Sequence, residues 1–325
     1  MLTNIVQLKA CTVICFILLV YLTYVSGDCS YHCEAFDCPC DCYRGEVECG
    51  NKHVTKIGSF PTHHRYEILD FGNNKIKKLT KKDFDQRSMK HLQTLQLSAN
   101  EIALIEDHSF KGLHHLHSIF LNSNEIEEIT LHTFAGLSRL HRLYLNNNKI
   151  KVLSTGIFQP FKDTLELLYL QSNNIAFIAK DVFGKMKQLK TLDLSKNKIT
   201  ELDASFLGVA PKMTHLFLGY NPWSCEENVV CSSFGEISKR QTKGSGAQKL
   251  HLHNNMICQT PEKFQQKDMA LVIQLFDCDV SKNKTEPLAT DNSGNGVARI
   301  NADIVIIAAH FATWMFVMLT LRTAC

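Results

Sequence analysis

The thirteen cysteines are the residues of this 325-residue chain best suited to covalent or metal chemistry. Cys11 and Cys15 lie in an apolar N-terminal run, and Cys325 is the last residue. The other ten form two groups separated by a long stretch without cysteine: Cys29, Cys33, Cys38, Cys40, Cys42 and Cys49, then Cys225, Cys231, Cys258 and Cys278. An even number in an exported chain predicts five disulfides. Zinc is the alternative, and an oxidising compartment disfavours it.

The fifteen histidines could in principle bind a metal, and His114, His115 and His117 lie close to His108. No cluster of carboxylates accompanies them, so we interpret them as surface residues and predict neither a metal site nor a cofactor. The chain has no nucleophile elbow, phosphate loop or H-E-x-x-H sequence, so we predict no catalytic residues and no enzyme. The formal net charge of +3 is too small to indicate a nucleic-acid partner.

A repeat with a period of about 24 residues organises the region between the two cysteine groups. Asparagines recur at this period with nearly constant spacing: Asn74, Asn100, Asn124, Asn148, Asn173, Asn197 and Asn221. An apolar pair precedes each asparagine at fixed positions: Leu69/Phe71, Leu95/Leu97, Ile119/Leu121, Leu143/Leu145, Leu168/Leu170, Leu192/Leu194 and Leu216/Leu218. An isoleucine stands two positions after all but the last asparagine, and Phe or Leu stands ten positions after these same six.

The alternating apolar pair predicts a short strand with one buried face. One repeat cannot bury that face alone, so successive strands should stack into a parallel sheet. The asparagine amides should satisfy backbone groups where the chain turns inward. The isoleucines and phenylalanines should fill the core from the convex side. Amphipathic helices are excluded, because they would need apolar residues every 3.6 positions.

This pattern resembles the extracellular leucine-rich-repeat family. The segment Leu92-x-x-Leu95-x-Leu97-x-x-Asn100-x-Ile102-x-x-Ile105, closing with Phe110 and Leu113, follows the family repeat position for position. The resemblance covers about residues 29–278. It implies an α/β leucine-rich-repeat solenoid, a curved horseshoe with a parallel concave β-sheet and disulfide-bonded end caps.

The caps close the two ends of the repeat array, where the core would otherwise be exposed. Cys40-x-Cys42-x6-Cys49 resembles the N-terminal cap of the family, but Cys29, Cys33 and Cys38 are additional, and six cysteines allow fifteen pairings. Asn221-Pro222-Trp223-x-Cys225 is similar to the entry of the C-terminal cap. For that cap the resemblance implies the pairs Cys225–Cys258 and Cys231–Cys278.

The two ends of the chain are apolar. Residues 10–25, followed by Ser26 and Gly27, predict a signal peptide over 1–27, with a signal anchor as the alternative. The apolar run 304–321 follows a patch of small residues and a short spacer. This order is typical of a glycosylphosphatidylinositol (GPI) attachment signal at Asn292 or Ser293. A single-pass helix is the alternative. Asn283 begins a glycosylation sequon.

These patterns divide the chain into six predicted parts. They are the signal peptide 1–27, the N-terminal cap 28–64, the repeats 65–221, the C-terminal cap 222–278, the linker with the attachment region 279–303 and the apolar tail 304–325.

The concave face of the sheet is the predicted ligand-binding surface. Seven outward residues lie between the buried strand positions: Asp70, Gln96, Phe120, Tyr144, Tyr169, Asp193 and Phe217. Strands about 4.8 Å apart would join Phe120, Tyr144 and Tyr169 into one stripe beside Arg142 and Leu167. Tyr, Phe and Arg are typical interface hot spots. Cross-strand packing of the sheet is the competing role. The predicted contact residues are Phe120, Arg142, Tyr144, Leu167, Tyr169, Asp193 and Phe217.

Together the patterns indicate a receptor for recognition or adhesion at the outer face of the plasma membrane. Slit-type guidance modules, the Nogo receptor and the variable lymphocyte receptors are similar in pattern. The resemblance implies a protein ligand on the concave face and signalling through a transmembrane co-receptor. The alternative is a matrix-organising leucine-rich-repeat protein, against which the apolar tail argues.

The lipid anchor gives a direct prediction. Phosphatidylinositol-specific phospholipase C should release the protein from the surface of expressing cells, because the lipid would be its only link to the membrane. Release is measured by blotting the medium. Retention of all the protein on the cells would contradict the anchor and favour the single-pass helix.

Overall fold

The computed structural model describes residues 40–43, 45–58, 65–84, 87–231, 234, 237, 250–253, 256–273 and 275–276. The chain divides into two compact units, residues 1–280 and 281–325, and the second lies wholly outside the described residues. The predicted signal peptide, Cys29, Cys33, Cys38, Cys278, Asn283, Asn292, Ser293 and the apolar tail also lie outside them. No helix of the described part is long and apolar enough to cross a bilayer.

The described elements are short. The strands are β1 (Asp41–Tyr43), β2 (Glu46–Glu48), β3 (Ile68–Asp70), β4 (Lys78–Leu79), β5 (Thr94–Gln96), β6 (Leu104–Ile105), β7 (Ser118–Phe120), β8 (Arg142–Tyr144), β9 (Val152–Leu153), β10 (Leu167–Tyr169), β11 (Phe177–Ile178), β12 (Thr191–Asp193), β13 (His215–Phe217), β14 (Trp223–Ser224), β15 (His251–His253) and β16 (Cys258–Thr260). The helical segments include η3 (Arg87–His91), η4 (Gln159–Phe161), η5 (Ala204–Val209), η6 (Glu262–Phe264) and α3 (Met269–Ile273), and residues 227–231 are also helical.

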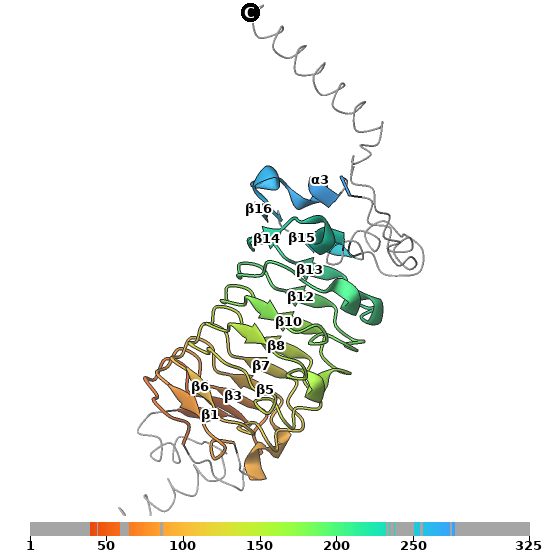
Figure 1. The fold of residues 1–325 in the computed structure, drawn as a ribbon. Helices are drawn as coiled ribbons and strands as arrows, with labels where there is room; N and C mark the ends of the chain where they lie inside the picture. The colour runs from red at the N-terminus through yellow and green to blue at the C-terminus, as the bar shows by residue number, and fades with distance from the viewer. Residues whose placement is uncertain are drawn as a thin grey trace, which may run out of the picture. The chain divides into compact units, whose positions relative to one another are not determined.

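One large sheet runs through the solenoid, as Figure 1 shows. Within the described residues its strand order is β1-β2-β3-β5-β7-β8-β10-β12-β13-β15. Only the β1–β2 pair is antiparallel, and every other neighbouring pair is parallel. The parallel repeat sheet that the sequence predicts is therefore confirmed. The other side of the repeats consists of turns, two-residue strands and 3-10 segments rather than long helices.

The core lies behind this sheet and is continuous along the repeats. All seven apolar strand pairs predicted from the sequence are 0% exposed. The phenylalanines of the convex side form a second row, in which Phe84–Phe110 and Phe110–Phe134 stack at ring-centroid distances of 5.7 and 6.0 Å. Each repeat thus buries its strand residues and its phenylalanine against the next repeat, and the interior is apolar from both sides.

The asparagine ladder joins neighbouring repeats. The Nδ2 group of Asn148 donates to the carbonyl of Leu145 in its own repeat at 3.0 Å and to that of Leu121 in the preceding repeat at 2.9 Å. Its Oδ1 atom accepts the backbone amide of Ile126, also in the preceding repeat, at 3.0 Å. The same cross-repeat bonds recur at Asn100, Asn124, Asn173, Asn197 and Asn221. The predicted role of the amides is confirmed.

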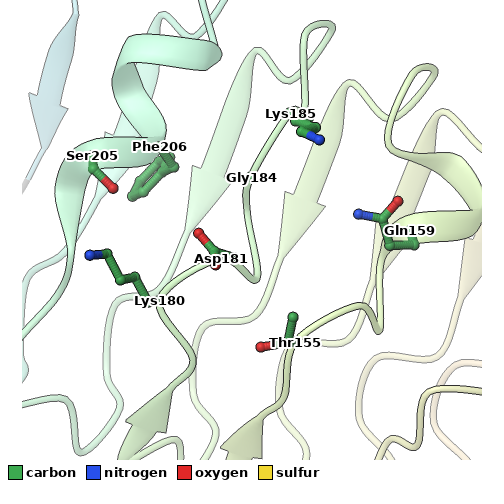
Figure 2. Close-up of a pocket in the computed structure, with 8 residues that line it drawn as sticks. All are labelled: Thr155, Gln159, Lys180, Asp181, Gly184, Lys185, Ser205 and Phe206. Atoms are coloured by element: carbon green, nitrogen blue, oxygen red, sulfur yellow. The ribbon is translucent and has the colours of Figure 1, made fainter.

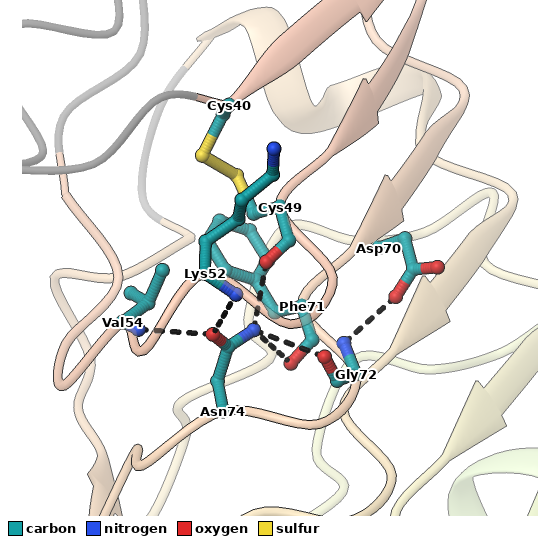
Figure 3. Close-up of a disulfide and its surroundings, with 8 residues drawn as sticks. All are labelled: Cys40, Cys49, Lys52, Val54, Asp70, Phe71, Gly72 and Asn74. Carbon is teal, nitrogen blue, oxygen red and sulfur yellow. Dashed lines mark hydrogen bonds between the residues drawn. A yellow bond between two sulfur atoms is a disulfide. The ribbon is translucent and has the colours of Figure 1, made fainter.

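The N-terminal cap is tied to the repeats through the first asparagine (Figure 3). Cys40 and Cys49 form a disulfide. Asn74 Nδ2 donates to the Cys49 carbonyl at 2.8 Å, and its Oδ1 accepts the amide of Val54 at 2.9 Å. The cap therefore bonds to the first repeat as one repeat bonds to the next.

The C-terminal cap extends the sheet by β15 and adds the separate pair β14–β16. Cys225 and Cys258 form the disulfide that the resemblance implies. Cys231 is also disulfide-bonded, and Cys278, its implied partner, lies outside the described residues. The Trp223 indole is fully buried, and its Nε1 donates to the Leu218 carbonyl at 3.0 Å. An apolar plug thus covers the last repeat.

Replacing one ladder asparagine should test how much the repeats depend on these bonds. Asn173→Ala should lower the free energy of unfolding by about 3 kcal/mol, because it leaves buried carbonyls and an amide without partners. Asn174→Ala is the matched control, since no hydrogen bond of its side chain occurs among the described residues and its amide bond to the Ile150 carbonyl is kept. It should change the value by less than about 0.5 kcal/mol. Urea unfolding followed by circular dichroism measures both, and equal losses would contradict the ladder's importance.

Candidate ligand-binding face

The side of the large sheet that faces away from the core, called here the open face, positions the candidate site. Each of its repeat strands has three residues, of which the middle one is buried and the two outer ones point to the open face. The parallel register places Phe120, Tyr144 and Tyr169 side by side on β7, β8 and β10. Residues one repeat apart in the sequence therefore become nearest neighbours on one surface.

The three aromatic rings form a continuous stack, called here the aromatic stripe. Phe120 and Tyr144 have ring centroids 4.5 Å apart and planes within 10° of parallel. Tyr144 and Tyr169 are 5.0 Å apart and within 11°. All three side chains are half-buried. Because the ring faces cover one another, a ligand would meet mainly the ring edges and the two tyrosine hydroxyls.

The Tyr169 hydroxyl is a hydrogen-bond donor at neutral pH. Burial raises the pKa of Tyr169 above its usual value, and the nearby Tyr144 and Asp193 add to the rise in pKa. The Tyr169 hydroxyl therefore keeps its proton over the physiological range. A rigid aromatic side chain with a donor at its tip suits contact with the polar and apolar parts of a protein surface.

Arg142 and Leu167 lie beside the stripe as the sequence predicts. They are register partners at the start of β8 and β10, with the Arg142 side chain exposed and Leu167 half-buried. Within the described residues Arg142 forms no ion pair with a carboxylate. Its guanidinium is available for an acidic group of a ligand.

Asp193 differs from the expectation of an accessible contact residue. It is only 8% exposed, and its Oδ1 accepts the backbone amide of Ser195 at 2.9 Å and the Ser195 hydroxyl at 2.7 Å. The carboxylate is thus used within its own repeat, since a serine two positions later can reach it. Phe217 lies on the far side of Asp193 in the strand register and is separated from the aromatic stripe.

Within the described part of the chain, two glutamines of the open face have side-chain oxygens without a partner. The Oε1 atoms of Gln96 and Gln171 are buried and have no hydrogen-bond partner among the described residues. Gln96 is the register neighbour of Phe120, and Gln171 lies two positions after Tyr169. Amide side chains therefore border the aromatic stripe. The sequence predicts Gln96 in the outward row beside Phe120, but only the structure reveals that the two Oε1 atoms are buried without a partner among the described residues.

Two hollows lie elsewhere on the described repeats. One of about 420 Å³ is drawn in Figure 2. Its lining residues are Thr155, Gln159, Lys180, Asp181, Gly184, Lys185, Ser205 and Phe206. It holds hydroxyls but no histidine that could serve as their base. A second hollow of about 400 Å³ lies beside Glu127 and Lys151, which pair with each other at 2.6 Å.

The histidines singled out in the sequence do not converge on one point, and three of them, His108, His115 and His117, each lie against a histidine of a neighbouring repeat. His117 lies 5.2 Å from His141, and His108 lies 5.1 Å from His132, between ring centroids. Among the described residues no group of three His, Cys, Asp or Glu side chains could hold a metal ion. Sequence reasoning missed this pairing because the two partners of each pair come from successive repeats.

A family model agrees with this geometry. The family model described as "Leucine rich repeat" matches residues 90–150 and 163–222. One similar solved structure, a TLR13–ssRNA13 complex, has 30% sequence identity and a TM-score of 0.46 and covers 49% of this chain. This chain spans 22% of that protein's length. Another is human 5T4 (Wnt-activated inhibitory factor 1, trophoblast glycoprotein), with 18% sequence identity and a TM-score of 0.47. The match covers 71% of this chain and 94% of the 5T4 chain.

No curated protein matches the sequence. The repeat matches, the parallel sheet of stacked short strands and the asparagine ladder nevertheless define the class. The chain is a leucine-rich-repeat protein, and its solenoid is an architecture that typically serves as a binding scaffold.

The stacked geometry of the aromatic stripe sharpens its expected effect on stability. Tyr144→Ala should lower the free energy of unfolding by about 1–2 kcal/mol, because Tyr144 stacks on both Phe120 and Tyr169. Tyr144→Phe keeps both stacks and should change it by less than about 0.5 kcal/mol. Urea unfolding measures both variants. An equal loss in Tyr144→Phe would show that the hydroxyl, rather than the ring, carries the contribution.

Proposed function

We propose that this protein is a cell-surface recognition or adhesion receptor that binds a protein ligand on the open, concave face of its repeats. The observation that carries the proposal is the aromatic stripe of Phe120, Tyr144 and Tyr169, half-buried and stacked beside the exposed Arg142. Aromatic residues and arginine are the side chains that most often dominate protein–protein binding energy. Rings that are already ordered lose little further freedom when a ligand covers them.

The extracellular setting is part of the proposal. The disulfides Cys40–Cys49 and Cys225–Cys258 support folding in an oxidising compartment. The apolar run before the first cap and the tail after Ser293 support export and a lipid anchor. A protein held in this way would signal through a transmembrane co-receptor. We propose no catalytic activity, because binding by the open face needs no reacting group.

The receptor can be tested on cells that express the full chain. A panel of secreted proteins and receptor ectodomains is applied to find a ligand, and its binding is then compared among variants. Tyr144→Ala and Tyr169→Ala should each weaken binding at least about tenfold, because each removes a hot-spot ring. Phe177→Ala is the matched control, since this aromatic is 59% exposed but lies on the separate β9–β11 pair.

Surface display of each variant is checked by antibody staining to exclude loss of folding. Binding that survives both tyrosine substitutions, or that is lost equally in Phe177→Ala, would contradict the open-face site. Selective binding of fibrillar collagen that ignores the tyrosines would favour the matrix-organising alternative.

A further inference from the structure

Six cationic or titratable side chains gather at the entry to β7 and β8, beside the aromatic stripe. We call them the histidine–arginine patch: His91, His115, His117, Arg139, His141 and Arg142. His91 and His115 have ring centroids 5.7 Å apart, and His117 and His141 lie 5.2 Å apart. Arg142 is the first residue of β8, whose last residue is Tyr144 of the aromatic stripe.

The patch has two rows across the repeats, one of His91, His115 and Arg139 and one of His117 and His141. Hydrogen bonds connect these rows. Arg139 Nη1 donates to His115 Nδ1 at 3.2 Å, so that nitrogen is an acceptor and carries no proton. His141 Nδ1 donates to the Arg139 carbonyl at 2.6 Å, which leaves its Nε2 as the nitrogen that can take up a proton. Arg139 thus touches a histidine of each row. Protonation of His115 Nδ1 would release the guanidinium of Arg139.

The patch departs from the charge pattern of the other repeats. Elsewhere lysines pair with glutamates of a neighbouring repeat, as in Lys149–Glu125 at 3.2 Å and Lys190–Glu166 at 2.8 Å. In the patch a cation or histidine follows another at the same repeat position, from His91 to His115 to Arg139. Within the described residues neither Arg139 nor Arg142 has a carboxylate partner.

The charged neighbours do not neutralise the patch. On the β10 side the carboxylate of Glu166 accepts a hydrogen bond from Lys190. This bond lowers the pKa of Glu166, and His141 and Arg142 lower the same pKa further. On the β5 side the register neighbour of His117 is the uncharged Gln93. Glu67, beyond Gln93, accepts from Gln93 and lies 3.6 Å from Arg65.

This crowding disfavours protonation of the free protein. Burial lowers the pKa of His117 below its usual value. The same pKa is lowered further by four groups: His141, Arg139, His115 and Arg142. Because the folded state binds the proton less well than the unfolded chain, stability should fall as pH drops below about 6.5. An anion placed on the patch would reverse the effect and favour protonation.

We propose that the histidine–arginine patch binds a carboxylate-rich segment of the protein ligand, and that this contact tightens as the pH falls toward 5.5. The inference rests on the proposed function and names the chemistry of its partner. Charge complementarity carries it, since the patch offers four histidines and two arginines that have no carboxylate partner among the described residues. Continuity with the aromatic stripe places the acidic segment where a ligand on the open face would reach it.

The pH dependence follows from proton uptake on binding. Carboxylates near the imidazoles favour their charged forms, so the complex holds more protons than the free protein. Affinity must then increase as protons become more available. Carboxylates of aspartate keep their charge at pH 5.5, so the change arises from the histidines.

The test uses the full chain in mild detergent, immobilised, with a fluorescent peptide of about ten aspartates as the probe. At constant salt the peptide should bind about tenfold more tightly at pH 5.5 than at pH 7.5, since several histidine–carboxylate pairs form together. His117→Gln/His141→Gln should reduce this ratio to less than about threefold. The control is His108→Asn/His132→Gln, which removes a stacked histidine pair outside the patch. Asparagine suits the positive φ of 64° at His108.

Three results would overturn the inference. They are equal affinity of the peptide at both pH values, a loss of pH dependence as large in the control as in the patch variant, and binding of a heparin decasaccharide without binding of the peptide. Circular dichroism at both pH values confirms that each variant is folded. If only the acidic-segment inference fails, Tyr144→Ala should still weaken ligand binding more than Phe177→Ala does. If the proposed function fails, the two variants should bind the ligand equally well.

Discussion

The asparagine ladder is the constraint on which the rest of the structure depends. Each ladder amide bonds to carbonyls in two successive repeats and accepts a backbone amide from the earlier one. A buried turn with unpaired backbone groups would cost several kcal/mol in each repeat. The ladder removes this cost and holds every repeat in the same register with its neighbour. The N-terminal cap uses the same bonds through Asn74, so the solenoid is sealed without a break in the pattern.

A shared register turns sequence positions into rows of side chains. Whatever residue type occupies one repeat position is placed about 5 Å from its counterpart in the next repeat. Three aromatic residues therefore become a stack, lysines and glutamates become ion pairs, and histidines become neighbouring ring pairs. The surface chemistry of this protein is consequently decided by which residue types recur from one repeat to the next, and by where that recurrence stops.

The periodicity was sufficient to predict the sheet, its buried residues and the asparagine bonds, because one dominant requirement repeats at every turn. It did not predict where a neighbouring side chain hydrogen-bonds an outward residue and so removes it from the surface. Asp193 occupies an outward position, yet Ser195 draws its carboxylate inward. Residues before the ladder asparagines adopt positive φ although none is glycine, as at Ala99 with 53° and Lys196 with 55°. No residue preference marks this conformation, because the ladder bonds impose it. The segments outside the described residues remain sequence predictions.

Stacking and ligand binding are compatible roles for the aromatic stripe. The stack holds Tyr144 between two rings, which restricts its side chain before any ligand arrives. Ordering a mobile aromatic at an interface costs about 0.5–1.5 kcal/mol, and a ring that is already stacked avoids most of this cost. The proposed binding at the histidine–arginine patch would behave in the opposite way, since burial and its cationic groups lower the pKa of His117 and an anion would offset those charges. A ligand over β7, β8 and β10 would meet both surfaces. The aromatic stripe would then supply binding energy at any pH, and the histidine–arginine patch would make the affinity for the ligand depend on pH.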